Sequence, residues 1–208
     1  MFTGIIEAVG TIRSVTPSGQ GEKAGVRLDI DAGALGMQNV RIGDSIAVNG
    51  ACMTVVEKTD TGFMVDVSRE SLDKTAGLDK TGEVNLEKAL ALGDMLGGHL
   101  VSGHVDGIGT VRVFRPVAES WELVIEAPRV LGKFLAYKGS VAVNGVSLTV
   151  NRVQDETTGC LFSINLIPHT LEVTTLKNLV EGAHVNLEID LIARYVERML
   201  SAGEKAAG

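Results

Sequence analysis

The sequence predicts an all-β protein built from two similar β-barrels in tandem. Three observations support this fold class: the chain repeats itself, its apolar residues alternate with polar ones over short stretches, and glycine is abundant where proline is scarce. The 208 residues include 25 glycines and 4 prolines, which suits many short strands joined by tight turns. Hydrophobic residues make up 45% of the chain, enough for a sizeable core.

The internal repeat organises the whole chain, and such self-similarity at a fixed period indicates a duplicated structural unit. Four blocks match in the same order: residues 4–12 with 103–111, 45–55 with 140–150, 65–72 with 164–171, and 84–87 with 185–188. The second unit therefore begins near Gly98. We expect a first barrel over residues 1–97, a second over 98–189, and a C-terminal helix and tail over 190–208.

The local patterns inside each unit are typical of strands. Val26–Ile30, Gly62–Val67 and Trp121–Glu126 alternate with period two. Ser45–Val55 alternates around a central Asn-Gly pair, which is the strongest short signal for a β-hairpin. Units of this size with many short strands must protect their sheet edges, so we expect closed barrels of six or a similar number of strands.

Two segments predict helices. A short helix is expected over Pro128–Leu135, because proline is favoured at the first helical position. In the tail, apolar residues recur at Ile192, Val196, Met199 and Leu200 with helical spacing, and Asp190 is placed to cap this helix. Its apolar stripe packs either on the barrels or against the same helix of other subunits, and both arrangements stay open. A frayed tail is expected from Ser201 onward.

Charge and composition disfavour several classes of partner. The formal net charge is −7 and only 4% of residues are aromatic, so nucleic acid is a poor expectation. No run approaches 18 apolar residues and the N-terminus lacks the pattern of a signal peptide, so we expect no membrane association and a cytoplasmic location. Two widely spaced cysteines form neither a metal pattern nor a disulfide framework.

Where the two units differ, they differ in chemical groups. Cys52 aligns with Ser147, and Ile5 aligns with His104. Two similar pockets with unlike groups suit a reaction in which two like molecules play unlike roles. Each residue also has a simpler interpretation, since a lone cysteine is usually a small buried residue and a lone histidine is usually structural. His99 precedes His104 by five positions, but no further ligands complete a metal site.

The sequence resembles the riboflavin synthases over essentially its whole length. The residues that carry the resemblance are Met1–Ile5, Gly43–Val55, Gly97–Gly107, Lys138–Val150 and Ile167–Glu172. The resemblance implies two six-stranded Greek-key barrels, a C-terminal helix and a homotrimer assembled through that helix. It implies a transferase that dismutates two molecules of 6,7-dimethyl-8-ribityllumazine, without a metal or other cofactor, at a site between the first barrel of one subunit and the second barrel of its neighbour.

The resemblance also implies site residues. The set expected to be sensitive for catalysis is Phe2, Ser45, Cys52, His104, Ser147, Thr149 and Asp190. The first-barrel pocket would use Gly4, Ile5, Ile6, Cys52, Met53, Thr54, Asp66, Val67, Ser68, Arg69, Glu70 and Ser71. The second would use Gly103, His104, Val105, Ser147, Leu148, Thr149, Asn165, Leu166, Ile167, Pro168, His169 and Thr170. Lys138 would reach into the shared site. Ser71 stands where the family has threonine, which keeps the hydroxyl group.

Three other functions fit the sequence less well. A non-catalytic lumazine- or flavin-binding antenna protein resembles the same family but generally keeps one competent pocket, whereas both pocket segments are intact here. A flavin reductase would need an Arg-x-Tyr-Ser/Thr motif, which Arg194-Tyr195-Val196 does not match. An oligonucleotide-binding barrel is disfavoured by charge. Whether the chain associates with lumazine synthase is left open by the sequence.

Overall fold

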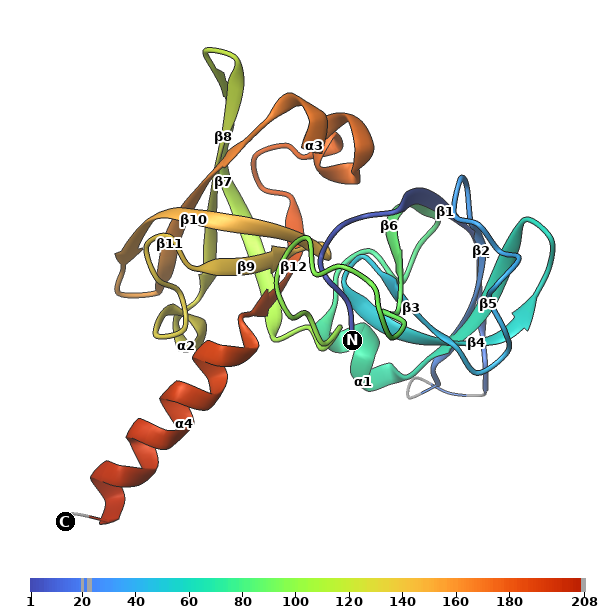
Figure 1. Ribbon diagram of the computed structural model, residues 1–208, viewed down its shortest axis with the longest axis horizontal. Helices are drawn as coiled ribbons and strands as arrows, with labels where there is room; N and C mark the ends of the chain where they lie inside the picture. The colour runs from blue at the N-terminus through green and yellow to red at the C-terminus, as the bar shows by residue number, and fades with distance from the viewer. Residues whose placement is uncertain (20, 22–23, 207–208) are drawn as a thin grey trace.

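The computed structural model describes residues 1–19, 21 and 24–206, and it contains two closed six-stranded antiparallel barrels followed by a helix (Figure 1). The predicted fold class is confirmed. The strands of the first barrel are β1 (Ala8–Pro17), β2 (Val26–Asp31), β3 (Ser45–Val48), β4 (Ala51–Lys58), β5 (Gly62–Val67) and β6 (Gly82–Lys88), with helix α1 (Arg69–Lys74) between the last two.

The second barrel repeats the first. Its strands are β7 (Gly107–Val117), β8 (Ser120–Pro128), β9 (Ser140–Val143), β10 (Val146–Asp155), β11 (Gly159–Leu166) and β12 (His184–Ile189), with helices α2 (Arg129–Gly132), α3 (Pro168–Val173) and the 3₁₀ helix η1 (Thr175–Asn178) in the connections. Around each barrel the order is the same: β1-β2-β5-β4-β3-β6 corresponds to β7-β8-β11-β10-β9-β12. The sequence repeat is therefore a repeat of topology.

The two Asn-Gly pairs form the hairpin turns that the sequence predicts. Asn49 and Gly50 have φ angles of 47° and 83°, and Asn144 and Gly145 have 47° and 81°. Positive φ at both central residues is the type I′ turn, which matches the twist of the flanking strands. The turns fix the register of β3 on β4 and of β9 on β10.

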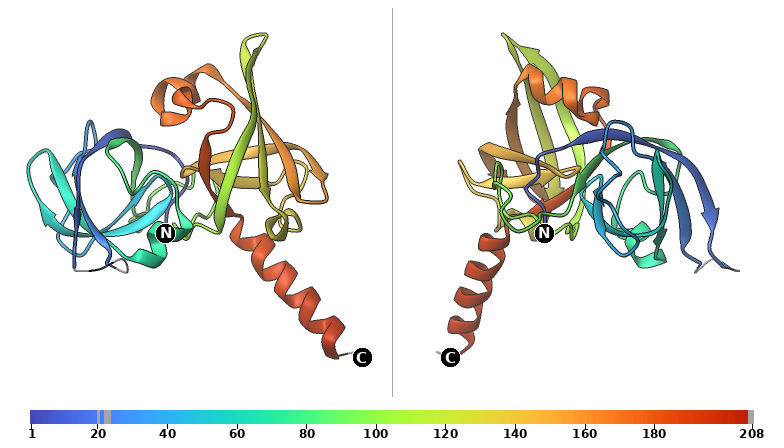
Figure 2. Two further views of the ribbon diagram at one scale, coloured as in Figure 1. Left: turned by 180° about the vertical axis from the view of Figure 1, so that it is seen from behind. Right: turned by 45° about the vertical axis from the view of Figure 1, so that its right-hand side comes forward.

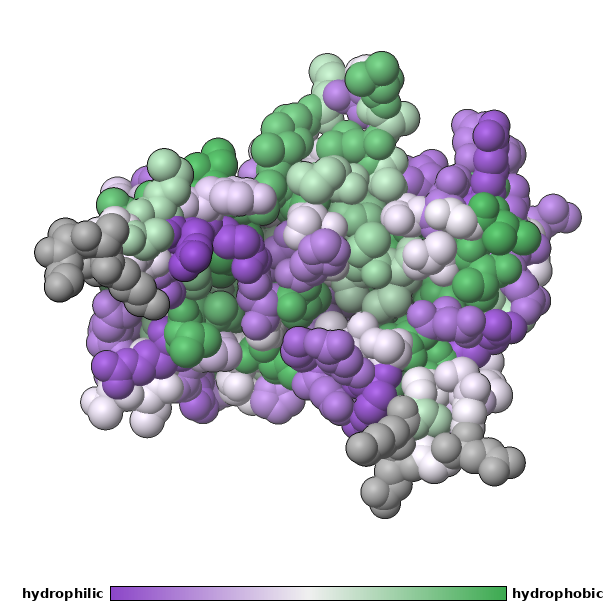
Figure 3. Space-filling model, turned by 90° about the horizontal axis from the view of Figure 1, so that it is seen from below, coloured by the Kyte–Doolittle hydropathy of each residue, from purple (hydrophilic) through white to green (hydrophobic). Residues whose placement is uncertain are grey.

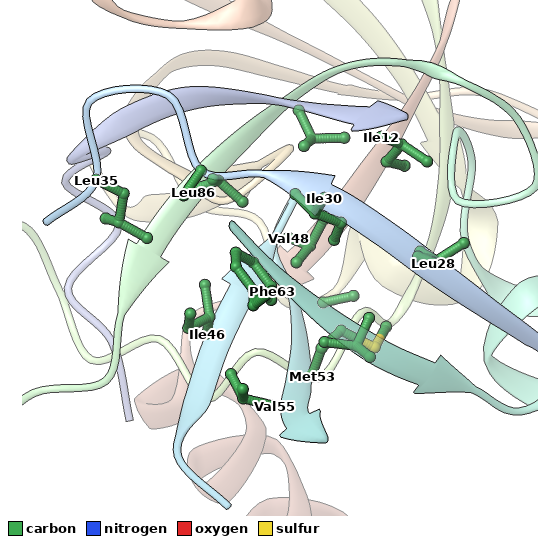
Figure 4. Packing of buried hydrophobic residues seen from close by; sticks show 14 of the residues in the cluster. Ile12, Leu28, Ile30, Leu35, Ile46, Val48, Met53, Val55, Phe63 and Leu86 are labelled. Carbon is green, nitrogen blue, oxygen red and sulfur yellow. The ribbon is translucent and has the colours of Figure 1, made fainter. Parts of the chain in front are cut away.

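Each barrel is filled by its own apolar cluster. In the first, Phe63 lies near the centre of the cluster, with Ile30, Ile46 and Val48 around its ring (Figure 4). Phe162 is the corresponding ring in the second cluster. Burying side chains of this size contributes about 1.5–3 kcal/mol each relative to exposure, so each barrel has a core of its own.

The strands β6 and β12 bury both of their faces, because one face lines a barrel and the other meets the opposite unit. In β6, Val84 and Leu86 belong to the barrel core, while Asn85 and Glu87 alternate with them and are also buried. In β12 the alternate buried pair is Asn186 and Glu188. A third apolar cluster, made of Phe2, Ala47, Val101 and Ala142, lies between the units.

The two buried asparagines tie the units together reciprocally. The Asn85 side chain donates to the carbonyl oxygen of Asn144 at 2.9 Å, and the Asn186 side chain donates to that of Asn49 at 3.0 Å. Each asparagine also accepts a backbone N–H with its side-chain oxygen, from Thr175 and Ala76 respectively. Buried amides are thereby satisfied across the interface, which fixes how the barrels sit.

Helix α4 (Leu191–Ala206) projects away from both barrels (Figure 2). Asp190 caps it as predicted, since its Oδ1 accepts the N–H of Ile192 at 2.9 Å. One side of the helix is attached to the second barrel, where Arg194 binds Asp106 and Glu197 binds Lys133. The apolar stripe lies on the other side and is exposed, at Ile192, Tyr195, Val196 and Met199. On the face of the molecule that carries α4, hydrophobic side chains lie exposed among polar ones (Figure 3).

Two helix predictions need correction. The helix expected over Pro128–Leu135 is only the single turn of α2, and Pro128 is the last residue of β8 and the N-cap of that turn. The rest of the segment continues as isolated turns, with Phe134 donating to Leu131. The tail expected to fray from Ser201 is helical through Ala206, and residues 207–208 lie outside the described part. Within that part, no helix is both long and apolar enough to cross a membrane.

Candidate active site

The N-terminal segment of each unit crosses to the other unit before its first strand begins. Phe2 and Val101 form an isolated antiparallel bridge, with N···O distances of 2.7 and 3.1 Å. Beyond this bridge the segments part: Gly4 accepts the N–H of Ser147 in the second barrel at 2.8 Å, and Gly103 accepts the N–H of Cys52 in the first barrel, also at 2.8 Å. We call residues 1–6 and 100–105 the crossing segments.

Glycine is required where each crossing segment lands. A Cβ atom on Gly4 would lie 2.6 Å from Cβ of Ser147, and one on Gly103 would lie 2.6 Å from Cβ of Cys52. Both glycines also have a positive φ, 76° and 80°, which costs other residues energy. The backbone of each segment therefore lies directly against the strand that follows the Asn-Gly turn of the opposite barrel.

This exchange corrects the expected composition of the two pockets. Gly4–Ile6 was expected in the first-barrel pocket, but Gly4 contacts Ser147 and Ile6 packs against the apolar cluster of the second barrel. His104 was expected in the second-barrel pocket, but Val105 packs on the first cluster and Gly103–Val105 line a hollow with Cys52. The expectation was wrong because the repeat shows only which residues correspond between the units. In the structure, each segment leaves its own unit and packs on the opposite barrel.

The first pocket is a hollow of about 290 Å³ on the first barrel. Cys52 is half-buried and the imidazole of His104 is exposed, so both groups are reachable from this hollow. The hollow is lined by residues from β4, from α1 and the residue after it, and from the crossing segment of the second unit: Ala51, Cys52, Met53, Glu70, Ser71, Lys74, Thr75, Gly103, His104 and Val105. A thiol, a hydroxyl and an imidazole thus come together from three segments.

The rim of this pocket is set by α1 and the strand before it. Ser68 caps α1, and its hydroxyl accepts the N–H of Ser71 at 3.1 Å. Asp66 is exposed and bound by Arg27 at 2.8 and 3.0 Å, and the hydrogen bond from that guanidinium lowers the pKa of Asp66. Val67 points into the barrel core instead, so its contribution is through the backbone. Thr54 is exposed on β4, and Arg69 is engaged with Asp73.

The second barrel carries the equivalent parts in a different chemical form, and we call this region the second pocket because it corresponds to the first by topology. Ser147, Leu148 and Thr149 lie on β10, and Thr149 is exposed. The equivalent of α1 is α3, which carries Pro168, His169 and Thr170 after the strand residues Asn165 and Leu166 and the exposed Ile167. Gly4 and Ile6 complete this wall from the first unit, whereas Ile5 is exposed and lines a hollow beside Ser45.

His99 is a member of the second site to which the sequence assigned no role. Its Nδ1 lies 2.7 Å from the hydroxyl oxygen of Ser147, and the ring is buried. Burial lowers the pKa of His99 below its ordinary value, while the negative charge of Asp190 opposes that shift. A buried imidazole within hydrogen-bond distance of a serine hydroxyl is an arrangement for exchanging protons. The only signal in the sequence was its proximity to His104, which instead serves the other pocket.

Four further predicted residues lie outside both pockets. Phe2 is fully buried between the units, so it supports the crossing segments from beneath. Ser45 opens on a separate hollow of about 850 Å³ with Thr3, Ile5 and Glu87. Asp190 caps α4. Lys138 has a positive φ of 64° and donates to the Asn151 side chain at 3.0 Å.

The sequence also missed two buried carboxylates, Glu87 and Glu188, which hold the crossing segments. Among the described residues, no group of three or more His, Cys, Asp or Glu side chains is arranged to hold a metal ion.

Two barrels of one topology, each receiving a segment of the other, define a tandem two-domain β-barrel protein. The family model described as Lumazine binding domain matches the chain twice, at residues 3–89 and 102–190. Solved structures of the same fold include LumP in complex with 6,7-dimethyl-8-(1′-D-ribityl) lumazine, at 25% identity and a TM-score of 0.76, covering 90% of this chain and 98% of that one. LumP in complex with riboflavin matches at 26% identity, with a TM-score of 0.78, over 91% and 99% of the two chains.

Curated relatives match at higher identity over nearly the full length. The riboflavin synthase of Photobacterium phosphoreum is 45% identical, covering 96% of this chain and 89% of its own. That of Mycobacterium tuberculosis strain H37Rv is 42% identical over 98% and 100% of the two chains, and that of Bacillus subtilis is 40% identical over 96% and 90%. The chain belongs to the riboflavin synthase family.

Proposed function

We propose that this chain forms riboflavin from two molecules of 6,7-dimethyl-8-ribityllumazine, by moving a four-carbon unit from one to the other and releasing 5-amino-6-(D-ribitylamino)uracil. The observation that carries the proposal is the pair of pockets, alike in backbone and unlike in chemical groups. One presents Cys52 and His104, and the other presents Ser147 with His99. A reaction between two identical molecules needs one to act as donor and the other as acceptor.

The chemistry needs proton transfer and close approach of two rings. One lumazine loses a proton from its 7-methyl group, and the second accepts a nucleophile at its C7; the rings then join and an elimination leaves the four carbons on one of them. Holding both rings in register replaces several kcal/mol of the entropic cost of their encounter. The imidazoles and hydroxyls supply proton donors and acceptors. Backbone groups of the crossing segments read the uracil-like edge of each ring.

We place the reacting pair between subunits. The first pocket of one chain would face the second pocket of its neighbour, with Lys138 reaching into the shared space, in a homotrimer held by α4. Support comes from the apolar stripe of that helix, where Ile192 and Tyr195 are each 64% exposed and Met199 is 75% exposed. A stripe of this kind on a projecting helix is typical of helix association. We also expect the trimer to reside in the cytoplasm, and a binding measurement with lumazine synthase tests whether the two associate.

The test is incubation of the purified protein with 6,7-dimethyl-8-ribityllumazine, following riboflavin by absorbance. Riboflavin should appear at half the rate of lumazine loss. His104→Ala should slow the reaction by roughly 10²-fold or more. The matched control is His184→Ala, which removes an exposed imidazole at the start of β12 and should leave the rate within about twofold.

The alternative function is a binding protein that holds a lumazine or flavin without converting it. The LumP complexes show this fold bound to a lumazine and to riboflavin. Tight binding of the lumazine with no riboflavin formed would favour this alternative. Absence of binding would contradict both functions.

A further inference from the structure

Two buried glutamates hold the crossing segments in the same way. Glu87 of β6 accepts three hydrogen bonds: from the N–H of Thr3 at 2.6 Å, from its hydroxyl at 2.7 Å, and from the N–H of Gly4 at 3.0 Å. Glu188 of β12 accepts the same three, from Ser102 at 2.6 and 2.7 Å and from Gly103 at 3.0 Å. The residues Glu87 and Glu188 are each 4% exposed.

Each glutamate is linked through a hydroxyl group to a further backbone N–H, nearer to a pocket. The hydroxyl of Thr3 donates to Glu87 and accepts the N–H of Ile5 at 3.1 Å. The hydroxyl of Ser102 donates to Glu188 and accepts the N–H of His104 at 3.3 Å. The carboxylate therefore orients the hydroxyl, and the hydroxyl fixes the backbone of the residue that follows the glycine.

The crossing makes these contacts serve the opposite barrel. Glu188 belongs to the second barrel, but Gly103–Val105, which it fixes, line the pocket of the first. Glu87 belongs to the first barrel, but Gly4 and Ile6, which follow from Thr3, lie on the second. A role in the stability of their own barrel would not produce this exchange.

We propose that Glu87 and Glu188 are positioning residues that act crosswise, each fixing from one barrel the wall of the substrate pocket on the other. This inference rests on the proposed function for the identity of the ligand. Neither carboxylate touches the pocket itself, so each acts through Thr3 and Gly4 or through Ser102 and Gly103.

Burial agrees with a role that depends on complete hydrogen bonding. Desolvation raises the pKa of both glutamates, more than their three hydrogen bonds lower it, and Glu7 and Asp106 add to the rise. A carboxylate held at this desolvation cost is tolerated because all three of its donors are in place. Replacing it by the isosteric amide sets an –NH₂ group against an N–H or O–H donor and breaks at least one contact.

The test reads each pocket separately through a thiol. Cys52 lies in the first pocket, whereas Cys160 is fully buried and its pKa is raised to about 11 by burial, so alkylation reports Cys52. For the second pocket, the double substitution Cys52→Ser, Ser147→Cys removes the thiol of the first pocket and places a thiol in the second. Alkylation of this transposed thiol then reports on the second pocket. Riboflavin is the probe, because it has no second substrate to react with. In the full chain, the rate of thiol alkylation is measured over a range of riboflavin concentrations, and a slower rate shows that riboflavin protects the thiol.

Glu188→Gln should weaken protection of the Cys52 thiol by roughly tenfold to a hundredfold and leave the transposed thiol within about twofold. Glu87→Gln should do the reverse. The milder substitutions Ser102→Ala and Thr3→Val remove only the hydroxyl that links each glutamate to the following backbone. They should give the same crossed pattern more weakly, and they replace a glutamine variant that does not fold.

Each carboxylate affecting the pocket of its own barrel, or both pockets equally, would overturn the inference. Riboflavin that protects neither thiol when both glutamates are intact would instead contradict the proposed function and leave the crossed contacts untouched. The two failures are therefore distinguishable in one set of measurements.

Discussion

Gly50 and Gly145 meet backbone to backbone where the two barrels touch. A Cβ atom on Gly50 would lie 2.7 Å from the backbone nitrogen of Gly145, and one on Gly145 would lie 2.9 Å from that of Gly50. Each glycine is the second residue of an Asn-Gly turn, so the two hairpins approach each other at their tips. The same residues thus meet two requirements, a positive φ and the absence of a side chain.

The close approach can be separated from the φ requirement. Gly145→Ala should destabilise the protein by about 2 kcal/mol or more beyond Gly182→Ala, because both alter a glycine of similar φ, 81° and 85°, but only Gly145 has backbone within contact distance. Urea unfolding measures the difference. Equal losses in the two variants would mean that the interface yields easily.

The buried asparagines should be costly to remove. Asn186→Ala leaves the carbonyl oxygens of Asn49 and Ala76 and the N–H of Ala76 without their partner, so we expect a loss of about 3 kcal/mol in the free energy of unfolding. Asn178→Ala is the control, since that side chain is exposed and donates to Glu83 on the surface. A loss no larger than that of the control would show that water replaces the amide.

The stability of the protein should fall in mild acid through His99. Because burial lowers the pKa of this imidazole in the folded state below 6.5, the unfolded chain binds the proton more readily, and stability is lost as the pH falls below about 6.5. Thermal unfolding between pH 7.5 and 5 measures this dependence, and His99→Gln should flatten it. An unchanged slope in the variant would assign the dependence to other groups.

The exposed stripe of α4 should control assembly. Met199→Lys places a charge on that stripe and should shift the oligomer toward monomers, whereas Ser201→Lys adds the same charge on the opposite side of the helix and should not. Sedimentation reports the state of association, and riboflavin formation should fall together with it if the reacting pockets belong to different subunits. Monomers with full activity would place both substrates within one chain.

The repeat made the fold predictable, because it aligned two sets of strands and two Asn-Gly turns whose conformation is a local property. It did not predict which barrel receives each crossing segment. Sequence equivalence places Ile5 opposite His104, but the direction a segment takes after Val101 or Phe2 depends on contacts with residues far away in the chain.

The sequence does contain a signal for the two glutamates, but the alternation of polar and apolar residues alone does not reveal it. Val84-Asn85-Leu86-Glu87 alternates apolar and polar residues, which ordinarily indicates a strand with one face in water. The same letters recur at residues 185–188, and a polar residue kept in both copies on the outer face of a strand is what a second, buried interface would produce. Only the packing of β6 and β12 against the opposite unit reveals it.

The exchange of residues 1–6 and 100–105 is the arrangement of a domain-swapped homodimer contained in a single polypeptide. Either barrel expressed alone as a monomer would lack a wall of its own pocket, and its first residues would have no opposite barrel to bind. During synthesis the first pocket stays incomplete until residues 103–105 have left the ribosome, although its barrel strands end at Lys88. Conversely, a chain cut between the barrels retains every contact needed for the halves to find each other, so a gene split there should still yield a paired, ligand-binding product.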